Sequence, residues 1–551
     1  MKAKLAKNDP VLITQLHLTD GSLFEMASPV GFVCLWMDLE HHSYSDETAA
    51  NLMRAERVGT SDIVARPAKG EFMRMSRLLG ASEYIETANK ETFIIAQLEE
   101  PSALDEAEAM CSFEGIDGLM LGPAASETIA VAATNTGKLN FIYLSKYSTE
   151  HEDNKLFESM DKAPSDPIMG ITELYNKDTR ADKINLSMGV FKDEQGSTPL
   201  LDSVKKAEAI IYAEEDTKAY SAIEGFAEFN DAVLPLIFGA GHEAVTSGRA
   251  ATIHTPGGSG ALRVVGDFLN KLSSSKTIWV SDPTWVNHIN IFETAGLEVK
   301  LYPYFDKASN GLAFEAMMTA LADIPSGDAV LFHGCCHNPT GVDPSNGQWQ
   351  LIADLVHGNG LLPVLDFAYQ GFAEGIREDG EGPLKLVRPG KETLVCGSFS
   401  KNFALYNERT GSLTAIATDA AAVDIATSQI KSVIRSIYSS PPAHGGIIVS
   451  TILNDPELHA QWEGELKKMR DRIQAMRQLL ADTLTAKSVP GDHSFITKQR
   501  GMFSFSGLSS EQVEQLKNEH AVYIVGNGRI NVAAITPSNC DALCEAIAKV
   551  N

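Results

Sequence analysis

The sequence lacks the features that mark membrane, secreted and nucleic-acid-binding proteins. No apolar run is long enough to cross a bilayer, which takes about 18 residues or more. The basic start of the chain leads into Asn8-Asp9-Pro10 and not into the apolar core of a secretory signal. Lysine and arginine total 46 against 72 for aspartate and glutamate, and the net charge of −26 opposes binding to nucleic acid or to an anionic membrane surface.

Cysteine is scarce and lacks the spacing of metal or disulfide motifs. The seven cysteines include no CxxC pair, and most lie in apolar runs. Such cysteines predict reduced, mainly buried thiols, and a cytoplasmic location is expected. The chain shows no internal repeat and no low-complexity tract. Its 551 residues exceed one ordinary core, so about two to four domains are expected.

The first part of the chain, residues 1–136, alternates apolar runs with helix-like segments. Strands are predicted at 31–37 and 93–97, and the alternation is typical of parallel β/α units. The polar stretch that follows, residues 137–155, is predicted to be a linker. A second unit is expected to occupy residues 156–551.

Polar residues follow successive strand-like runs of this first part, where β/α barrels place their sites. At Asp38-Leu-Glu-His41, Val64-Ala-Arg66 and Gln97-Leu-Glu99 it resembles the metal-dependent hydroxy-oxo-acid aldolases that act on pyruvate and related acids. The resemblance implies that Asp38 and His41 form an acid/base pair, that Arg66 binds the oxo acid and that Glu99 is a metal ligand. The chain departs from the aldolase family in two respects that argue against these roles.

The second metal carboxylate of the aldolase family falls on Ala125, which cannot coordinate a metal. A complete barrel also needs about 250 residues, and the first part has roughly 150. We therefore expect a truncated β/α-barrel-like unit that holds no metal and has no aldolase activity. The alternative is a module that binds a 2-oxo acid or mediates oligomerisation.

In the second unit, a lysine follows an apolar, β-prone run. Residues 392–396 predict a buried strand, and Ser398-Phe-Ser400-Lys401 comes after it, with Arg409 eight residues past the lysine. Two hydroxyls and a guanidinium can hold a phosphate, and a lysine amine that loses solvation can form a Schiff base with a carbonyl. Pyridoxal phosphate carries both a phosphate and an aldehyde. Considered alone, residues 392–409 fit equally well a surface lysine near a solvated arginine.

Three further motifs are ambiguous alone but agree with one another. Pro256-Gly-Gly258-Ser259 opens a predicted helix, whose N-terminus offers free N–H groups to an anion. Trp285 follows a strand-like run and can stack on a flat ring, although core packing is the commoner role of a single tryptophan. Asn338, Asp366 and Lys401 end three successive strand-like runs, so all three are expected at the carboxyl edge of one parallel sheet.

Taken together, these motifs make residues 156–551 resemble the pyridoxal-phosphate aspartate aminotransferases of the bacterial type. The resemblance is close at His337-Asn-Pro-Thr-Gly, Asp366-Phe-Ala-Tyr-Gln-Gly-Phe, Ser400-Lys-Asn-Phe and Leu405-Tyr-Asn-Glu-Arg. It implies an α/β protein of pyridoxal-phosphate fold type I, with a mostly parallel seven-stranded sheet. The large domain is expected at about residues 196–465 and the small α/β domain at about 156–195 and 466–551.

The resemblance also implies roles around the cofactor. Lys401 is the Schiff-base lysine and the proton shuttle, and Asp366 keeps the pyridine nitrogen protonated. Tyr369 and Asn338 hydrogen-bond the ring oxygen, and Trp285 stacks on the ring. The implied phosphate-binding residues are Gly258, Ser259, Ser398, Ser400 and Arg409, together with Tyr220, which is also counted among the catalytic groups and reaches the site from the other subunit.

Substrate binding is implied at Gly189, Arg435 and Arg529, in addition to Trp285 and Asn338. Arg529 binds the α-carboxylate, and Arg435 binds the distal carboxylate from the other subunit. The sequence departs from the family pattern at Ala404, where glycine is usual, and at Ser440, where asparagine is usual.

The expected activity is amino transfer from L-aspartate to 2-oxoglutarate, which gives oxaloacetate and L-glutamate. The expected partners are small amino and 2-oxo acids and a second copy of the chain in a homodimer with shared sites, with neither nucleic acid nor membrane. An aromatic amino acid aminotransferase of the same fold is the alternative.

Overall fold

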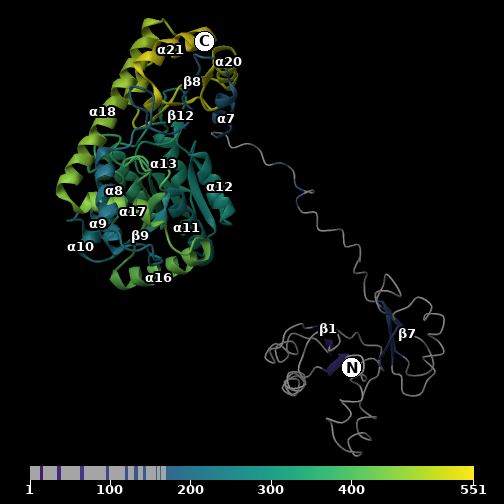
Figure 1. Cartoon of the computed structure of the whole chain (residues 1–551). Coiled ribbons are helices and arrows are strands. Elements are labelled where there is room, and N and C mark those ends of the chain that lie inside the picture. The colour runs from purple at the N-terminus through teal and green to yellow at the C-terminus, as the bar shows by residue number, and fades with distance from the viewer. Residues whose placement is uncertain are drawn as a thin grey trace, which may run out of the picture. The chain divides into compact units, whose positions relative to one another are not determined.

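The computed structural model describes residues 169–551, together with Phe157, Met160, Lys162 and seven short strands that lie between residues 13 and 143. The chain divides into two compact units, Met1–Lys162 and Ala163–Asn551 (Figure 1). Each unit is described by itself.

The first unit contains two small sheets. One is parallel in the order β1-β2-β3, and the other has the order β4-β5-β6-β7. The strands are β1 (Ile13–Gln15), β2 (Cys34–Asp38), β3 (Asp62–Arg66), β4 (Ile95–Leu98), β5 (Gly118–Leu121), β6 (Ala130–Ala133) and β7 (Asn140–Tyr143). The parallel pairs agree with the β/α expectation, but β6 is antiparallel to both β5 and β7.

The linker prediction for residues 137–155 is wrong at its start. β7 lies inside that range, because its apolar run Phe141-Ile142-Tyr143 pairs with β6 instead of crossing to the next unit. Of the aldolase-like residues, Asp38 and Arg66 end β2 and β3. His41, Glu99, Ala125 and the polar stretch 148–155 lie outside the described residues.

The second unit is built on a seven-stranded sheet of order β11-β10-β14-β15-β16-β17-β9. The strands are β9 (Ala250–Pro256), β10 (Thr277–Asp282), β11 (Glu298–Pro303), β14 (Ala329–His333), β15 (Leu362–Phe367), β16 (Thr393–Ser398) and β17 (Thr410–Ile416). β17 is antiparallel to both of its neighbours, and every other pair is parallel. The predicted mostly parallel sheet of seven strands is confirmed.

Helices cover both faces of this sheet, because successive residues of a strand point to opposite faces. Val330 and Phe332 of β14 belong to one hydrophobic core, and Leu331 between them belongs to the other. Full burial of each such side chain stabilises the fold by about 1.5–3 kcal/mol. The core of Leu331 contains α11 (Gly257–Leu272), α12 (Val286–Thr294) and α16 (Ala420–Ile437); that of Val330 contains α8 (Asp202–Glu214), α9 (Ala227–Phe238), α13 (Phe314–Ala322), α14 (Asn346–Gly358) and α17 (Ala443–Asn454).

The remaining elements form the smaller α/β part, beyond one end of the sheet. Its strands pair as β19 with β8 and β18 with β20. These elements are α7 (Met169–Lys177), β8 (Ile184–Asn185), α19 (Phe495–Lys498), β18 (Phe503–Phe505), α20 (Ser510–His520), β19 (Val522–Tyr523), β20 (Arg529–Asn531), η4 (Val532–Ala534) and α21 (Pro537–Val550); shorter elements beside the sheet are α10 (Glu243–Thr246), β12 (Phe305–Asp306), β13 (Gly311–Leu312), α15 (Glu378–Glu381) and η3 (Pro383–Leu386).

One long helix, α18 (Pro456–Ala486), joins the two parts of this unit. It starts sharply, because Asp455 accepts hydrogen bonds from the backbone N–H groups of Glu457 and Leu458 and because proline fits the first helical position. The helix then runs unbroken through the domain boundary expected at residue 465. It packs against α8 and α17 at one end and against α21 at the other (Figure 1).

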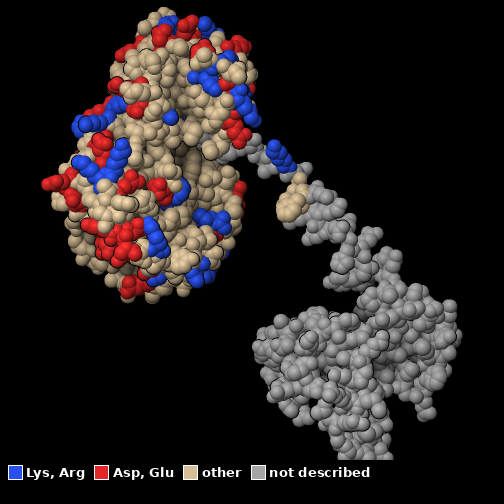
Figure 2. Space-filling model, viewed as in Figure 1, with Lys and Arg blue, Asp and Glu red and all other residues tan. Residues whose placement is uncertain are grey.

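The surface of this unit carries charges of both signs. On the face drawn in Figure 2, acidic and basic side chains are interspersed over residues 169–551. Within the part of the chain that the structure describes, no helix combines the length and the apolar character needed to cross a membrane.

We expect residues 156–551 to fold without the first unit, because the two cores of the second unit close within residues 184–547. A chain that starts at Leu156 should unfold cooperatively, with a midpoint within about 2–4 °C of that of the same unit in the full chain, a difference that corresponds to about 1 kcal/mol or less. It should also keep the activity expected from the sequence within about twofold. Calorimetry and steady-state assays of both chains provide the measurement.

An insoluble or inactive 156–551 chain would show that the first unit is structural. Metal-dependent cleavage of a hydroxy-oxo acid by the full chain, lost on Glu99→Ala, would show that the first unit is catalytic. The full chain with Glu100→Ala, which removes the adjacent carboxylate that the resemblance gives no role, serves as the matched control.

Candidate active site

A cavity of ≈250 Å³ opens at the carboxyl edge of the sheet, where β14, β15 and β16 lie side by side. It brings together all predicted site residues except Tyr220 and Arg435. The lining residues are Gly189, Gly258, Ser259, Leu262, Trp285, His333, Asn338, Asp366, Ala368, Tyr369, Ser398, Ser400, Lys401, Tyr406, Arg409, Phe503 and Arg529.

One wall of the cavity is the N-terminus of α11. Gly257 there has a φ of 72°, in the left-handed region. A Cβ on it would lie 2.6 Å from Nη2 of Arg409. A Cβ on Gly258 would also crowd the Cβ of Ser398, at 3.1 Å. Glycine at these positions therefore lets a guanidinium and a hydroxyl approach the free N–H groups of a helix N-terminus. Such a set binds anions.

The hydroxyls of the following strand complete this anion site. Ser398 Oγ donates to Ser400 Oγ at 3.3 Å, and Arg409 Nη1 donates to Ser400 Oγ at 3.5 Å. Arg409 Nη1 also donates to the carbonyl oxygen of Tyr406 at 3.0 Å, which fixes the guanidinium. A guanidinium presents a planar pair of donors, so it matches the oxygens of a phosphate.

Lys401 lies just past β16, and its amine faces the cavity. Among the described residues, Nζ has no hydrogen-bond partner, and it lies 4.5 Å from the ring centre of Tyr369. Burial lowers the pKa of Lys401 to about 8, although Asp366 opposes this shift. At pH 7 a pKa of about 8 leaves roughly a tenth of the amine uncharged, on the order of a hundredfold more than in a solvated lysine, and the uncharged form is the nucleophile.

Asp366 is buried at the end of β15, where Nε2 of His288 donates to its Oδ2 at 2.9 Å. Burial alone would raise the pKa of Asp366, but the hydrogen bond and the charges of His288 and Lys401 outweigh it and lower the pKa. Behind this pair, Thr284 Oγ1 lies 2.8 Å from Nδ1 of His288 and 3.2 Å from Nε2 of His333. The carboxylate is thus held ionised, with its other oxygen available to a ligand.

His288 is a site residue that the sequence motifs do not single out. They do contain a signal for such a partner, because a carboxylate at the end of an apolar strand needs one. His288 lies on α12 three residues after Trp285, so a helix starting beside Trp285 carries it toward Asp366. Tyr406 and Phe503 also line the cavity, and no local pattern in the sequence places these two rings there.

Arg529 forms the opposite wall. Its Nη1 donates to Oδ1 of Asn338 at 3.1 Å, and its Nη2 donates to the carbonyl oxygen of Ser187 at 2.6 Å. The guanidinium lies 4.2 Å from the ring centre of Phe503, and burial lowers the pKa of Arg529 to about 10. Nε has no partner among the described residues, so the cation retains a donor.

Gly189 closes the cavity beside that ring. A Cβ at Gly189 would lie 2.7 Å from Cζ of Phe503, so a larger residue would push the ring from Arg529. The two departures from the family pattern do not line the cavity. Ala404 has φ of 53°, which explains why glycine is usual there, since a left-handed alanine costs roughly 1–2 kcal/mol.

Tyr220 and Arg435 are not brought to this cavity within one chain. Tyr220 is 98% exposed, and Arg435 lies exposed near the end of α16, where it donates to Oγ of Ser439. Their predicted roles across subunits remain predictions.

The cavity fits pyridoxal phosphate on three observations of this chain. An uncharged amine can accept the aldehyde, the glycine turn with Ser398 and Arg409 can accept the phosphate, and buried Asp366 has a free oxygen for a protonated ring nitrogen. Together with the mixed seven-stranded sheet, this chemistry defines the class of protein: a fold-type I pyridoxal-phosphate enzyme.

Comparison with known proteins narrows the class. Residues 181–547 match the family "Aminotransferase class I and II". The chain is similar to the aspartate aminotransferase of Salmonella typhi, with 53% identity over 395 residues that cover 72% of this chain and 100% of that protein. It is also 42% identical to the aromatic-amino-acid aminotransferase of Escherichia coli (strain K12), over 72% of this chain and 100% of that one.

A solved structure is also similar to this chain. The crystal structure of the aromatic-amino-acid aminotransferase from Burkholderia pseudomallei, covalently bound to pyridoxal phosphate, has a TM-score of 0.70 and 43% identity and covers 72% of this chain and 99% of its own. The chain belongs to the class I and II aminotransferases, and it is a transaminase that depends on pyridoxal phosphate.

Replacing the cavity lysine tests this site directly. We expect Lys401→Ala to lower transaminase turnover by several orders of magnitude, because a general acid–base group alone contributes roughly 10²–10⁴-fold and a covalent anchor adds to that. Single-turnover and steady-state rates, with absorbance of the bound cofactor, provide the measurement. Lys385→Ala is the matched control, because Lys385 is half-buried and does not line the cavity. Near-normal turnover of Lys401→Ala would contradict the assignment.

Proposed function

We propose that this protein is an aspartate aminotransferase, which converts L-aspartate and 2-oxoglutarate to oxaloacetate and L-glutamate. The observation that carries the proposal is a desolvated lysine amine set between a buried carboxylate and an anion cradle, with a second buried cation, Arg529, across the cavity. The 53% identity to the Salmonella typhi aspartate aminotransferase supports the choice of substrate.

When bound, pyridoxal phosphate supplies an electron sink that makes the α-hydrogen of an amino acid acidic. Lys401 would hold its aldehyde end, and Gly258, Ser259, Ser398, Ser400 and Arg409 would hold its phosphate. Asp366, kept ionised by His288, would hold a proton on the ring nitrogen. Trp285 would stack on the ring, and Tyr369 and Asn338 would donate to its oxygen.

Lys401 would also move the proton of the reaction. Because burial brings its pKa to about 8, the amine can both take a proton from the α-carbon of the substrate and return it near neutral pH. A solvated lysine, with a pKa of about 10.4, would have on the order of a hundredfold less of the uncharged form that accepts the proton.

Arg529 would orient the substrate through its α-carboxylate. The guanidinium is buried and already positioned by Asn338 and Ser187, so little side-chain entropy is lost on binding. Phe503 packs against its face, and Gly189 leaves room for that ring, so both would keep water from the bound carboxylate.

The site is incomplete within one chain, and we propose that a homodimer completes it. Tyr220 would reach the phosphate, and Arg435 would bind the distal carboxylate, each from the partner subunit. Both residues are exposed in the single chain, as residues that face a partner must be. The cytoplasmic location expected from the sequence stays a prediction.

An aromatic amino acid aminotransferase is the second candidate, because relatives with that name match at 42–44% identity. For residues 1–155, we propose a truncated, non-catalytic aldolase-like unit. The alternative, a 2-oxo-acid-binding or oligomerisation module, would be favoured if calorimetry of that unit detected binding of pyruvate or oxaloacetate.

Arg435 should matter only for dicarboxylate substrates. A hydrogen bond to a charged group contributes about 1.5–3 kcal/mol, and leaving the distal carboxylate unpaired costs more. We therefore expect Arg435→Leu to lower kcat/KM for aspartate by at least about tenfold to a hundredfold and to leave that for phenylalanine little changed.

The matched control is Arg388→Leu, because Arg388 is paired with Asp354 on the surface and does not line the cavity. It should leave both substrates unaffected. Equal losses for aspartate and phenylalanine in Arg435→Leu would contradict the proposed role.

Subunit mixing tests whether the sites are shared. Lys401→Ala and Arg435→Leu subunits are each expected to be deficient alone, but their hybrid dimer should have one site with both defects and one with neither. Activity toward aspartate should therefore recover, to at most about half per mixed dimer, as exchange proceeds. No recovery after mass spectrometry has confirmed exchange would mean that Arg435 acts within its own chain.

A further inference from the structure

A second and larger cavity, of ≈840 Å³, lies apart from the lysine site. Its walls come from the turn after β14, from α15 and from the segment around α19. The lining includes Cys335, Asp343 and Asp379, together with Glu374, Gln499 and Arg500. Nothing in the transaminase site uses these residues.

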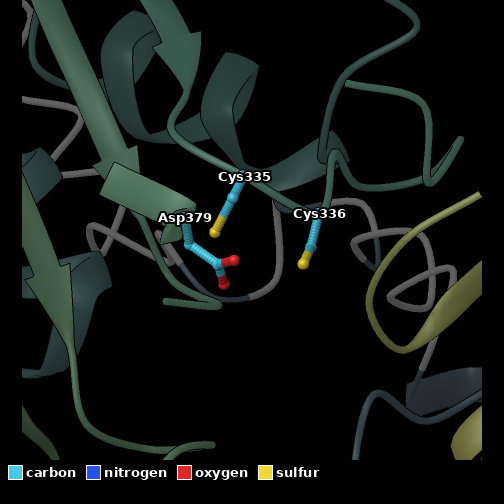
Figure 3. Close-up of side chains that lie close together, drawn as sticks. All are labelled: Cys335, Cys336 and Asp379. Atoms are coloured by element: carbon cyan, nitrogen blue, oxygen red, sulfur yellow. The ribbon is translucent and has the colours of Figure 1, made fainter. Parts of the chain in front are cut away.

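Two adjacent thiols lie at this cavity: Cys335 lines it, and Cys336 follows in the same turn. In a strand, the side chains of successive residues diverge. β14 ends at His333, however, and Cys336 has φ of 53° in the left-handed region. The turn brings the two sulfur atoms and a carboxylate oxygen of Asp379 within 4.8 Å of one another (Figure 3).

Asp379 presents a carboxyl group of fixed orientation beside the thiols. Its Oδ2 accepts from the backbone N–H groups of Gly371 and Ala373, at 2.8 and 3.0 Å. Its Oδ1 accepts from those of Glu374 and Gly375, at 2.8 and 3.2 Å. Four donors set the orientation of the carboxylate, as outer partners do for a ligating carboxylate, and the longest of these contacts is on Oδ1.

A second buried carboxylate, Asp343, lies close by. It accepts from the backbone N–H groups of Cys336 and His337, at 2.7 and 2.9 Å, and so anchors the turn that carries the thiols. Within residues 169–551, neither Asp343 nor Asp379 has an ion-pair partner.

The nearby arginines are engaged elsewhere. Arg477 donates to the backbone carbonyl oxygens of Ile496 and Gly501, and Arg500 pairs with Glu374. Asp343 and Asp379 are therefore held by backbone N–H groups and not by a side-chain cation. A bound divalent ion would let the two neighbouring thiols lose their protons without adding to the negative charge beside these carboxylates.

We propose that Cys335 and Cys336 bind a soft divalent metal ion of the zinc and cadmium class, with Oδ1 of Asp379 as the third ligand and a water molecule from the cavity as the fourth. Binding replaces the two thiol protons, which leave to solvent, so the ion with two thiolates and one carboxylate carries a net charge of −1. Two sulfur and two oxygen donors suit a tetrahedral ion of this class. The cavity supplies the entry path, because Cys335 and Asp379 line it.

The proposal does not depend on the transaminase activity. Its consequence for that activity is local, because Cys336 lies two residues before Asn338 and its sulfur contacts the carbonyl oxygen of Tyr369 at 4.0 Å. The site is thus distinct from the lysine cavity but adjoins two of its walls.

Cadmium is the probe, used on the full chain loaded with its cofactor. Equilibrium dialysis at micromolar cadmium, followed by elemental analysis, gives ions bound per chain, and the ultraviolet thiolate-to-cadmium band reports sulfur ligation. We expect Cys335→Ser/Cys336→Ser to bind one ion fewer than the unmodified chain, with a matching loss of that band. Each single serine variant should weaken binding by at least about tenfold.

Two controls separate this site from the other cysteines. Cys396→Ser alters a buried thiol that packs on the other face of the sheet, and Cys540→Ser/Cys544→Ser removes the other closely spaced pair, on α21. Neither control variant should remove the ion assigned to Cys335 and Cys336. In the chain that combines the two double variants, the losses of bound ions should therefore add. Far-ultraviolet circular dichroism and thermal midpoints check that each variant folds.

An unchanged number of bound ions in a folded Cys335→Ser/Cys336→Ser chain would overturn the proposal. So would a mass lower by two hydrogens that a reductant restores and that maps to this pair, because the thiols would then form a disulfide. If the double variant does not fold, the single variant Cys335→Ser, on the cavity wall, takes its place in the test. Cadmium binding as tight as in the unmodified chain would then overturn the proposal.

Discussion

The buried hydrogen bond between His288 and Asp366 is the interaction on which the lysine cavity depends. Asp366 ends a strand in the middle of the sheet, where water cannot solvate its charge. Burial raises the pKa of its carboxyl, and the hydrogen bond from His288 opposes that rise and favours the carboxylate, the form that can pair with a protonated ring nitrogen. The charge that His288 preserves also opposes the fall in the pKa of Lys401, so one contact sets the protonation of both groups.

The parallel pairing of β14, β15 and β16 converts sequence order into proximity. Asn338, Asp366 and Lys401 are far apart in the chain but follow neighbouring strands that end at one edge. This geometry is why the sequence could predict the lysine cavity. An apolar run predicts a strand, a polar residue after it predicts an edge, and the edge of a parallel sheet is a binding site.

Other features depend on contacts that no local pattern reveals. His288 joins the site through the packing of α12, and Phe503 lies on Arg529 because β18 pairs with β20. The linker predicted at residues 137–155 includes β7, whose conformation depends on its pairing with β6 and not on the polar residues around it. Likewise, the boundary expected at residue 465 falls within α18, because the capping and periodicity of that helix continue across the division into domains.

The expected roles of Tyr220 and Arg435 depend on a second chain, which a single sequence describes only by resemblance.

The unbroken course of α18 has a mechanical consequence. Its 31 residues make a rod of about 46 Å, at about 1.5 Å per residue, with one end packed on α8 and α17 and the other on α21. A rod cannot stretch, so the smaller part can approach the sheet only by tilting or bending about this strut. Its long lever arm turns a rotation of a few degrees near the sheet into a displacement of ångströms at the far end. The geometry thus favours hinge motion over sliding and makes the spacing of Arg529 from Lys401 sensitive to the angle of a single helix.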